Sequence, residues 1–305
     1  MRTVLTGGSG VIGRATVPAL REAGHEVLVV TRSPRSAEIV RGLGAEPVSG
    51  DVLDLDSLSA AYEGADAVVN LATKVPVGNR ALVPGAWRSH DTLRTRGVAN
   101  VVEAARLAGV RRVVQESVSF VYADQGDDWV TEQSPVDITP MTEPVAVGET
   151  QIQDYACGSR VGVVLRFGTI VGDDPQTRYW LRATERGRRI GIGHPSDWAH
   201  LIHTDDLGGA VLASLHAPSG VYNVGAEPAQ RHELVQGYAD AAHVESRAFL
   251  GPIARWAIGP RLEPLARSLR VSSDHFAAQT GWGATRPKFE SSWLDAAMNR
   301  CPATS

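Results

Sequence analysis

Three glycines near the start of the chain have the spacing that holds a phosphate group. Gly7, Gly10 and Gly13 lie in the segment TGGSGVIG, between a β-branched run at residues 2–5 and an apolar stretch that begins at Val11. In a strand–turn–helix unit of this kind, backbone N–H groups at the helix N-terminus face a pyrophosphate. The segment predicts a dinucleotide site with contacts from Gly7, Gly8, Ser9, Gly10, Val11, Ile12 and Gly13. A tight turn without a ligand is the alternative.

Two arginines follow the next expected strand, where the adenosine ribose of a bound dinucleotide would lie. A carboxylate in this place would accept hydrogen bonds from the ribose and repel a 2′-phosphate, whereas Arg32 and Arg35 would attract the phosphate. These residues predict NADP(H) as the cofactor, with two solvated loop arginines as the alternative. Asp51, followed by Val52, can accept from the adenine amino group or can cap the next helix.

Proton transfer beside a nicotinamide is usually performed by a Tyr with a Lys four residues later, and this chain has no such pair. Its two lysines are Lys74 and Lys288, and neither follows a Tyr at that distance. Ser117, at the expected end of a strand beside the nicotinamide, is our candidate catalytic donor. A hydroxyl satisfied by the backbone is the alternative. Further hydroxyl and imidazole candidates are Ser119, Tyr122, Thr142, Tyr155 and His194.

Short apolar runs alternate with helical stretches through the first half of the chain. We expect strands at residues 2–5, 26–31, 46–49, 67–71, 112–117 and 161–166, and helices at 11–23, 55–62 and 86–108. This alternation predicts an α/β fold, a Rossmann-type doubly wound parallel sheet with right-handed crossovers. The near-continuous apolar strands indicate a sheet that is covered on both faces.

The pattern loosens after about Asp173, where we expect helices at 177–186 and 205–215 and extended segments at 199–202 and 220–224. This predicts an NADP-binding domain at residues 1–172, with returning segments near 199–225. The rest, residues 173–305, would be a smaller, interleaved substrate lobe with a lid at 248–270, a stretch that three prolines divide. Ser119, Trp180, Trp198 and Trp256 are expected to contact the substrate, with ordinary core packing as the alternative for each Trp.

Composition narrows the possible partners. The 305 residues carry a net charge of −4 without a basic run, which argues against nucleic acid and anionic membranes. We find no apolar run long enough to span a bilayer and no signal peptide, so we expect a cytoplasmic protein. Cys157 and Cys301 do not form a disulfide framework. His200, His203, Asp205 and Asp206 could suggest a metal site, but the Asp pair is better explained as a cap of the helix that follows, and we expect no metal. The oligomeric state stays open.

Several segments together resemble the extended short-chain dehydrogenase/reductase superfamily, of the NAD-dependent epimerase/dehydratase type. Besides the glycine turn, they are NLA at 70–72, SVSFVY at 117–122, VLRFGTIVG at 164–172, HTDD at 203–206 and GVYNV at 220–224. The resemblance covers nearly the whole chain. It implies cofactor contacts from Leu71, Ala72, Thr73, Ser117, Phe167, Gly168 and Thr169.

The chain departs from this family at the catalytic residues. Members carry a Ser or Thr four residues before the Tyr of a V-Y-G signature, and a Tyr-x-x-x-Lys ahead of a Glu. Counting from Tyr122 and Glu149 places Val118, Met141 and Val145 at these three positions, and none can donate a proton. In this the chain is similar to atypical members, the tailoring ketoreductases of aromatic polyketide pathways.

We therefore expect an NADPH-dependent ketoreductase that acts on a bulky, aromatic polyketide ketone in secondary metabolism. Holding the carbonyl carbon close to the nicotinamide gives several orders of magnitude in rate. A general acid adds roughly 10²–10⁴, which a substrate hydroxyl or water would supply here. The alternatives are a non-catalytic redox sensor that binds NADP(H), and a nucleotide-sugar epimerase or dehydratase, which would need a base.

Overall fold

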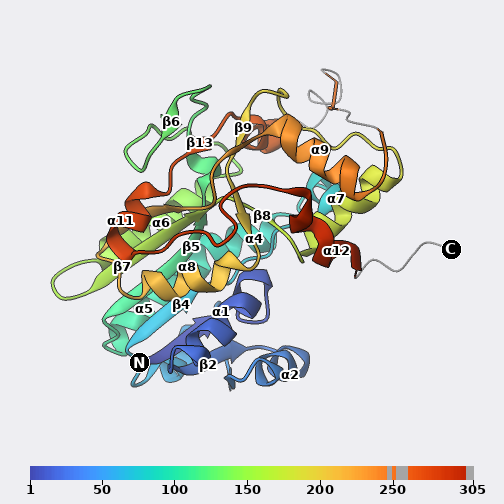
Figure 1. Cartoon of the computed structure of the whole chain (residues 1–305). Coiled ribbons are helices and arrows are strands. Elements are labelled where there is room, and N and C mark those ends of the chain that lie inside the picture. Colours follow the sequence, from blue (N-terminus) through green and yellow to red (C-terminus); the bar gives the residue numbers. More distant parts are fainter. Residues whose placement is uncertain (246–248, 252–259, 300–305) are drawn as a thin grey trace.

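Seven parallel strands form the central sheet, in the order β11-β7-β5-β4-β1-β2-β3 (Figure 1). The computed structural model describes residues 1–245, 249–251 and 260–299. The strands are β1 (Arg2–Thr6), β2 (Glu26–Thr31), β3 (Glu46–Ser49), β4 (Ala67–Asn70), β5 (Arg112–Val118), β7 (Val161–Phe167) and β11 (Gly220–Val224). Each lies within one residue of its predicted bounds, and the predicted doubly wound α/β fold is confirmed.

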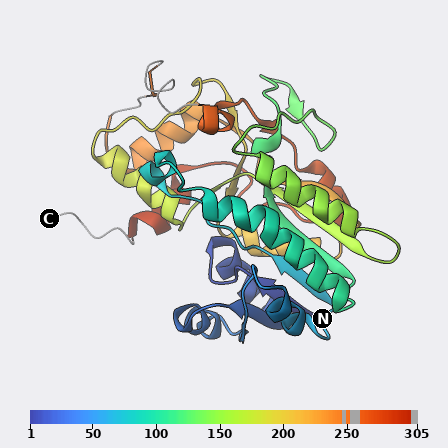
Figure 2. The same cartoon turned by 180° about the vertical axis from the view of Figure 1, so that it is seen from behind.

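Helices cover both faces of this sheet. In Figure 1, α1 (Val11–Glu22) and α8 (Asp206–Ser214) lie in front of the strands, and Figure 2 shows α5 (Val98–Leu107) and α6 (Glu143–Tyr155) on the other side. The remaining helices of this part are α2 (Pro34–Gly42), α3 (Leu55–Tyr62) and α11 (Asp274–Thr280). Successive strand residues point to opposite faces, so Val4 joins the α3/α5 core and Leu5 joins the α1/α8 core.

The helical stretch predicted at residues 86–108 is interrupted by a wider turn. It consists of α4 (Arg88–Thr92), a π-turn (Leu93–Gly97) and α5. Arg94 in this turn is buried, and it donates hydrogen bonds to the carbonyl oxygen of Glu116 at 2.5 Å and to its carboxylate at 2.7 Å. Single π-turns of this kind are frequent at functional sites.

A smaller lobe lies beyond the carboxyl ends of the strands. Its helices α7 (Pro175–Glu185), α9 (Arg231–Ala241) and α12 (Asp295–Asn299) lie together at the upper right of Figure 1. They share an apolar core with Leu201 and Trp293. Three two-stranded sheets complete the lobe: β8 (Thr169–Val171) with β10 (Leu201–His203), β9 (Trp198–Ala199) with β12 (Ala229–Gln230), and β6 (Trp129–Val130) with β13 (Arg270–Val271).

Short 3₁₀ helices η1 (Gly78–Leu82), η3 (Ser119–Val121), η4 (Pro260–Ala266) and η5 (Ser291–Leu294) lie in the connections. Of the predicted lid at 248–270, residues 252–259 lie outside the described residues. No helix in the described parts of the chain has both the length and the apolar character needed to cross a membrane.

Candidate active site

A cavity of about 1000 Å³ opens at the carboxyl ends of the strands, between the sheet and the smaller lobe. It extends from the glycine turn and the end of β2, past the ends of β4, β5 and β7, to α7 and α9. Ligands of open α/β sheets bind at this edge, where the strand order reverses. Its volume lies at the upper end of the range of small-molecule and cofactor sites.

The glycine turn is packed so closely that its backbone leaves no room for side chains. Gly7 has φ of 75°, and a Cβ on it would lie 2.4 Å from the carbonyl oxygen of Leu71. A Cβ on Gly13 would lie 2.4 Å from the Cα of Gly8. Of the predicted contacts, Gly7, Ser9, Gly10, Val11 and Ile12 line the cavity, whereas Gly8 and Gly13 serve the packing of the turn.

The adenosine end of the cavity contains one of the two predicted arginines. Arg32 lines it and forms an exposed ion pair with Asp51 at 3.4 Å. Ser36, in the first turn of α2, also lines it, but Arg35 does not. Asp51 and Val52 are lining residues too. Asp51 accepts from Leu53 N at 2.9 Å, and the N-cap of α3 is Asp54, so Asp51 is not the helix cap that we considered.

Most of the cofactor contacts predicted around the ends of β4 and β7 line the cavity, and one does not. Leu71, Ala72, Thr73, Gly168 and Thr169 line the cavity. Phe167 is buried and lies in the core beneath α1 and α8 instead.

Ser117 does not line the cavity, although its neighbours Glu116 and Val118 do. Its hydroxyl donates to Glu149 Oε1 at 2.5 Å, and Arg166 binds the same carboxylate at 2.6 Å and 2.9 Å. These contacts do not fit the predicted roles of Ser117 as proton donor and cofactor contact. Its hydroxyl is satisfied within the protein, by a side chain and not by the backbone.

The three positions that the resemblance assigns to catalytic residues form an apolar wall. Val118, Met141 and Val145 all line the cavity. Met141 and Val145 are only 8% and 4% exposed. Thr142 also lines the cavity, but its hydroxyl oxygen accepts from Thr139 N at 2.9 Å. At these three positions the cavity wall therefore offers apolar side chains and no proton donor.

The other predicted donors lie away from the described lining. Tyr122 donates to Asn223 Oδ1 at 2.7 Å, and Tyr155 donates to the carbonyl oxygen of Val110. His194 Nδ1 lies 2.8 Å from Ser196 Oγ on the exposed surface. Ser119, predicted to contact substrate, is buried, and its hydroxyl has no partner in the described part of the chain.

Other polar groups also line the cavity, and two of them, His90 and Glu116, were not predicted from the sequence. Thr73 Oγ1 and His90 Nδ1 lie 3.0 Å apart. Glu116 forms a buried ion pair with Arg94 at 2.7 Å; burial raises the pKa of Glu116, and Arg94 opposes the shift. Burial lowers the pKa of His200 to about 3, so its ring is neutral at pH 7. Neither His90 nor Arg94 belongs to a recognisable local motif, and only their places on a predicted helix could have drawn attention to them.

The far half of the cavity is aromatic and basic. Trp180 and Trp198 line it as predicted for the substrate side, together with Tyr179 and Arg231. Arg231 Nη2 donates to the carbonyl oxygen of Arg267 at 2.6 Å, and burial lowers its pKa. Trp256 lies outside the described residues.

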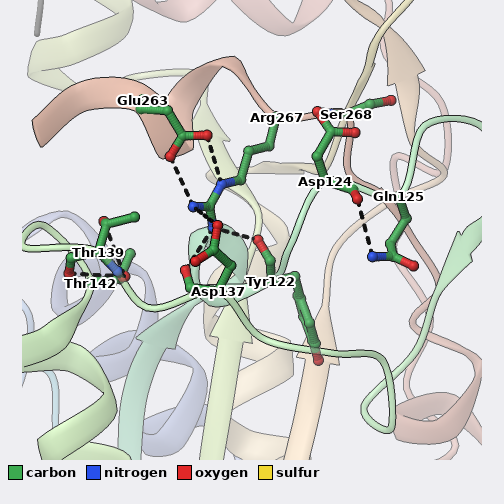
Figure 3. A network of polar contacts seen from close by, with 9 residues as sticks. All are labelled: Tyr122, Asp124, Gln125, Asp137, Thr139, Thr142, Glu263, Arg267 and Ser268. Carbon is green, nitrogen blue, oxygen red and sulfur yellow. Dashed lines mark hydrogen bonds and ion pairs between the residues drawn. The ribbon is translucent and has the colours of Figure 1, made fainter. Parts of the chain in front are cut away.

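Arg267 connects two segments that border the cavity (Figure 3). Its guanidinium contacts the carboxylates of Glu263 at 2.8 Å and Asp137 at 2.7 Å, and it donates to the Tyr122 carbonyl oxygen at 2.7 Å. This joins η4, whose Leu265 lines the cavity, to the segment that leads to Met141 and Thr142.

The two aspartates at the start of α8 have protein partners. Asp206 accepts from Thr285 N at 2.8 Å, and Asp205 pairs with Arg286 at 3.2 Å. Asp205 is the N-cap residue of α8, but its side chain makes no capping hydrogen bond, which corrects our interpretation of this pair. In the described parts of the chain, no three His, Cys, Asp or Glu side chains gather in a metal-binding arrangement.

Comparison with known proteins places this geometry in context. Residues 3–225 match the model of the NAD dependent epimerase/dehydratase family. A 3-diazoavenalumate denitrifying reductase from Streptomyces sp is 30% identical over 319 residues, which cover 97% of this chain and 98% of that protein. A 4-hydroxy-2-methyl-3-oxo-4-farnesyl-3,4-dihydroquinoline-1-oxide ketoreductase from Stigmatella aurantiaca is 34% identical over 124 residues, 41% of this chain and 35% of that one.

The fold is shared with solved structures of sugar-nucleotide enzymes. The crystal structure of the Thermus thermophilus UDP-glucose 4-epimerase in complex with NAD superposes with a TM-score of 0.75 at 21% identity, covering 98% of both chains.

Proposed function

Because the chain belongs to the NAD dependent epimerase/dehydratase family, we propose that it is a reductase that uses NADP(H) on a bulky aromatic ketone. The observation that carries the proposal is the apolar wall of Val118, Met141 and Val145. An epimerase or dehydratase removes a proton from its substrate and needs a base at that wall. Reduction of a ketone needs no base, and its proton can come from a hydroxyl of the substrate or from water.

The chain's own residues would bind and orient the reactants. A reduced nicotinamide, when bound, supplies the hydride. The glycine turn and the N-terminus of α1 would hold the pyrophosphate, and Arg32 would contact the 2′-phosphate. Trp180 and Trp198 would flank a flat aromatic substrate, so that its carbonyl carbon is held within reach of the hydride.

Reductive removal of a diazo group is a second candidate. It is favoured by the full-length similarity to the 3-diazoavenalumate denitrifying reductase. An aryl diazonium ion that accepts a hydride releases N₂ and leaves an arene, and this exchange consumes no proton. A wall without proton donors suits that chemistry as well. A redox sensor is less well supported, because the cavity continues well past the glycine turn to Trp180 and Trp198.

Paired substrates separate these candidates. The purified protein with NADPH deuterated at nicotinamide C4 is offered 8-hydroxy-1-tetralone, 4-hydroxybenzenediazonium or UDP-glucose, and the products are analysed for deuterium. We expect a deuterated alcohol from the ketone, with a preference for one face of NADPH. Deuterated phenol alone would favour the diazo reaction, and epimerised UDP-glucose would contradict the proposal. Heat-inactivated protein is the control for direct reduction by NADPH.

A further inference from the structure

Two polar side chains stand on the cavity wall close to the apolar replacements. We propose that Thr73 and His90 form a proton relay, in which Thr73 donates to the oxygen of the reduced carbonyl and His90 returns a proton to Thr73 from water. The inference rests on the proposed function and names the protein groups through which water would supply the proton.

Thr73 is placed by the end of β4, which is the neighbour of β5 in the sheet. The strand ends at Asn70, whose side chain accepts from Ala72 N at 3.2 Å and donates to Gln115 Oε1 on β5 at 2.7 Å. These bonds fix the turn that carries Thr73. Because parallel strands end at the same edge, Thr73 lies beside the end of β5, where Val118 lines the cavity.

His90 is held against Thr73 by the packing of α4. It is 4% exposed, and its ring meets the ring of Trp87 edge-on, with 5.3 Å between the centroids. Trp87 belongs to one apolar cluster with Met141, which occupies the position of the family's Tyr. The imidazole is therefore close to the place from which that Tyr would have donated.

The order of hydrogen bonds allows a proton to move through the pair. When Nδ1 of His90 carries a proton, it donates to Thr73 Oγ1, and the threonine O–H is left to donate into the cavity. The carbonyl carbon accepts the hydride, its π electrons move to the oxygen, and that oxygen takes the threonine proton. Thr73 then takes the proton of His90, and His90 regains one from water. The ketone is reduced and the nicotinamide is oxidised, and one proton is taken up from solvent.

Glu116 is a less suitable donor, although it lines the same end of the cavity. Its side chain is held by Arg94 at 2.7 Å in a buried ion pair, so its position is fixed by a protein partner.

Threonine variants with 1-tetralone, which has no neighbouring hydroxyl, test the relay. In single turnovers with bound NADPH, we expect Thr73→Val to slow reduction by roughly 10²–10⁴, the usual contribution of a general acid. Thr73→Ser should stay within a few-fold of the wild type. His90→Gln should also be slow and should regain rate with added imidazole. Thr92→Val, on the same helix but outside the cavity lining, is the matched control.

Cofactor binding and a second readout keep the outcomes distinct. We expect Thr92→Val to bind NADPH as the wild type does, and we compare all rates at saturating NADPH because Thr73 is also a predicted cofactor contact. In the NADP⁺ complex, the wild type should bind 4-nitrophenolate in preference to 4-nitrophenol, and Thr73→Val should lose that preference, as followed by absorbance over a pH series. An unchanged rate in Thr73→Val, or equal nitrophenolate binding in both proteins, overturns the relay and leaves the proposed reductase function standing.

Failure of the wild type to bind NADPH overturns the proposed function itself. If 1-tetralone is not reduced, the nitrophenolate comparison decides the relay alone.

Discussion

At the residue scale, Arg32 is the side chain that we propose to select the cofactor. Its ion pair with Asp51 is exposed, at 61% and 38% of the two side chains, so a 2′-phosphate can displace it at little cost. We expect NADPH to bind more tightly than NADH, and Arg32→Asp to reverse the order by about ten- to a hundredfold. Fluorescence titration of both cofactors measures this. Arg41→Asp, at the other end of α2, is the control, and equal titration curves for the wild type would contradict the assignment.

Restoring the family's pair should harm this enzyme. Met141 and Val145 are buried in the cavity wall, so Met141→Tyr with Val145→Lys would fill space that a substrate needs. A buried lysine also costs several kcal/mol or loses its proton. We expect kcat/KM to fall, mainly through KM, in steady-state kinetics with 8-hydroxy-1-tetralone. A gain in activity, together with normal wild-type turnover of 8-methoxy-1-tetralone, would show instead that the original residues were simply lost.

Sequence reasoning located the cavity well but misjudged side-chain direction at one strand. Arg32, Asp51 and the residues after β4 and β7, which it predicted as cofactor contacts, line the cavity. It chose Ser117, although one step along a strand reverses the face, so Glu116 and Val118 line the cavity while Ser117 meets Glu149. The pairing of Thr73 with His90 joins two segments through a long connection without periodicity, and no spacing rule predicts it.

At the element scale, strands were easier to predict than helices. The buried strands can be recognised in the sequence as apolar β-branched runs, and their bounds differ from the prediction by one residue at most. Two missed helices carried start signals that were available: Ser33 before Pro34 begins α2, and Gln230 with Glu233 forms a capping box on α9. The π-turn had no signal of its own, because the contact of Arg94 with Glu116 is made by distant segments.

The Arg267 contacts predict how firmly η4 is held. Arg267→Met removes the donor to the Tyr122 carbonyl oxygen and both ion pairs, and an unsatisfied buried group costs about 1–3 kcal/mol. We expect a Tm lower by several degrees and a raised KM, since Leu265 loses its support. Glu263→Gln keeps a hydrogen-bond acceptor at an exposed site and should cost much less. Thermal unfolding of the two variants compares them, and equal losses would contradict this account.

At the scale of the whole molecule, buried His200 makes stability depend on pH. Its folded pKa of about 3 lies below the unfolded value of 6.5, so its contribution is complete above pH 6.5 and is lost as the pH falls toward 3. Burial also lowers the pKa values of His25 and His203. Between pH 7.5 and pH 5, we expect the free energy of unfolding to fall by about 2 kcal/mol less in His200→Gln than in the wild type, as measured by urea unfolding. His194→Gln, at an exposed site, is the control, and equal losses would contradict the prediction.

The order of the strands also limits how the protein can be divided. The outermost strand, β11, is reached only after the chain has passed through α7 and α8, and it pairs with β7 along residues 163–167. A fragment that ends at residue 172 would keep β7 but expose its backbone N–H and C=O groups as a new edge. Such an edge is a template for a strand from a second molecule, so the isolated fragment should self-associate or aggregate. Stability and solubility of the cofactor domain would thus depend on β11, a segment that the chain reaches only after α7 of the substrate lobe.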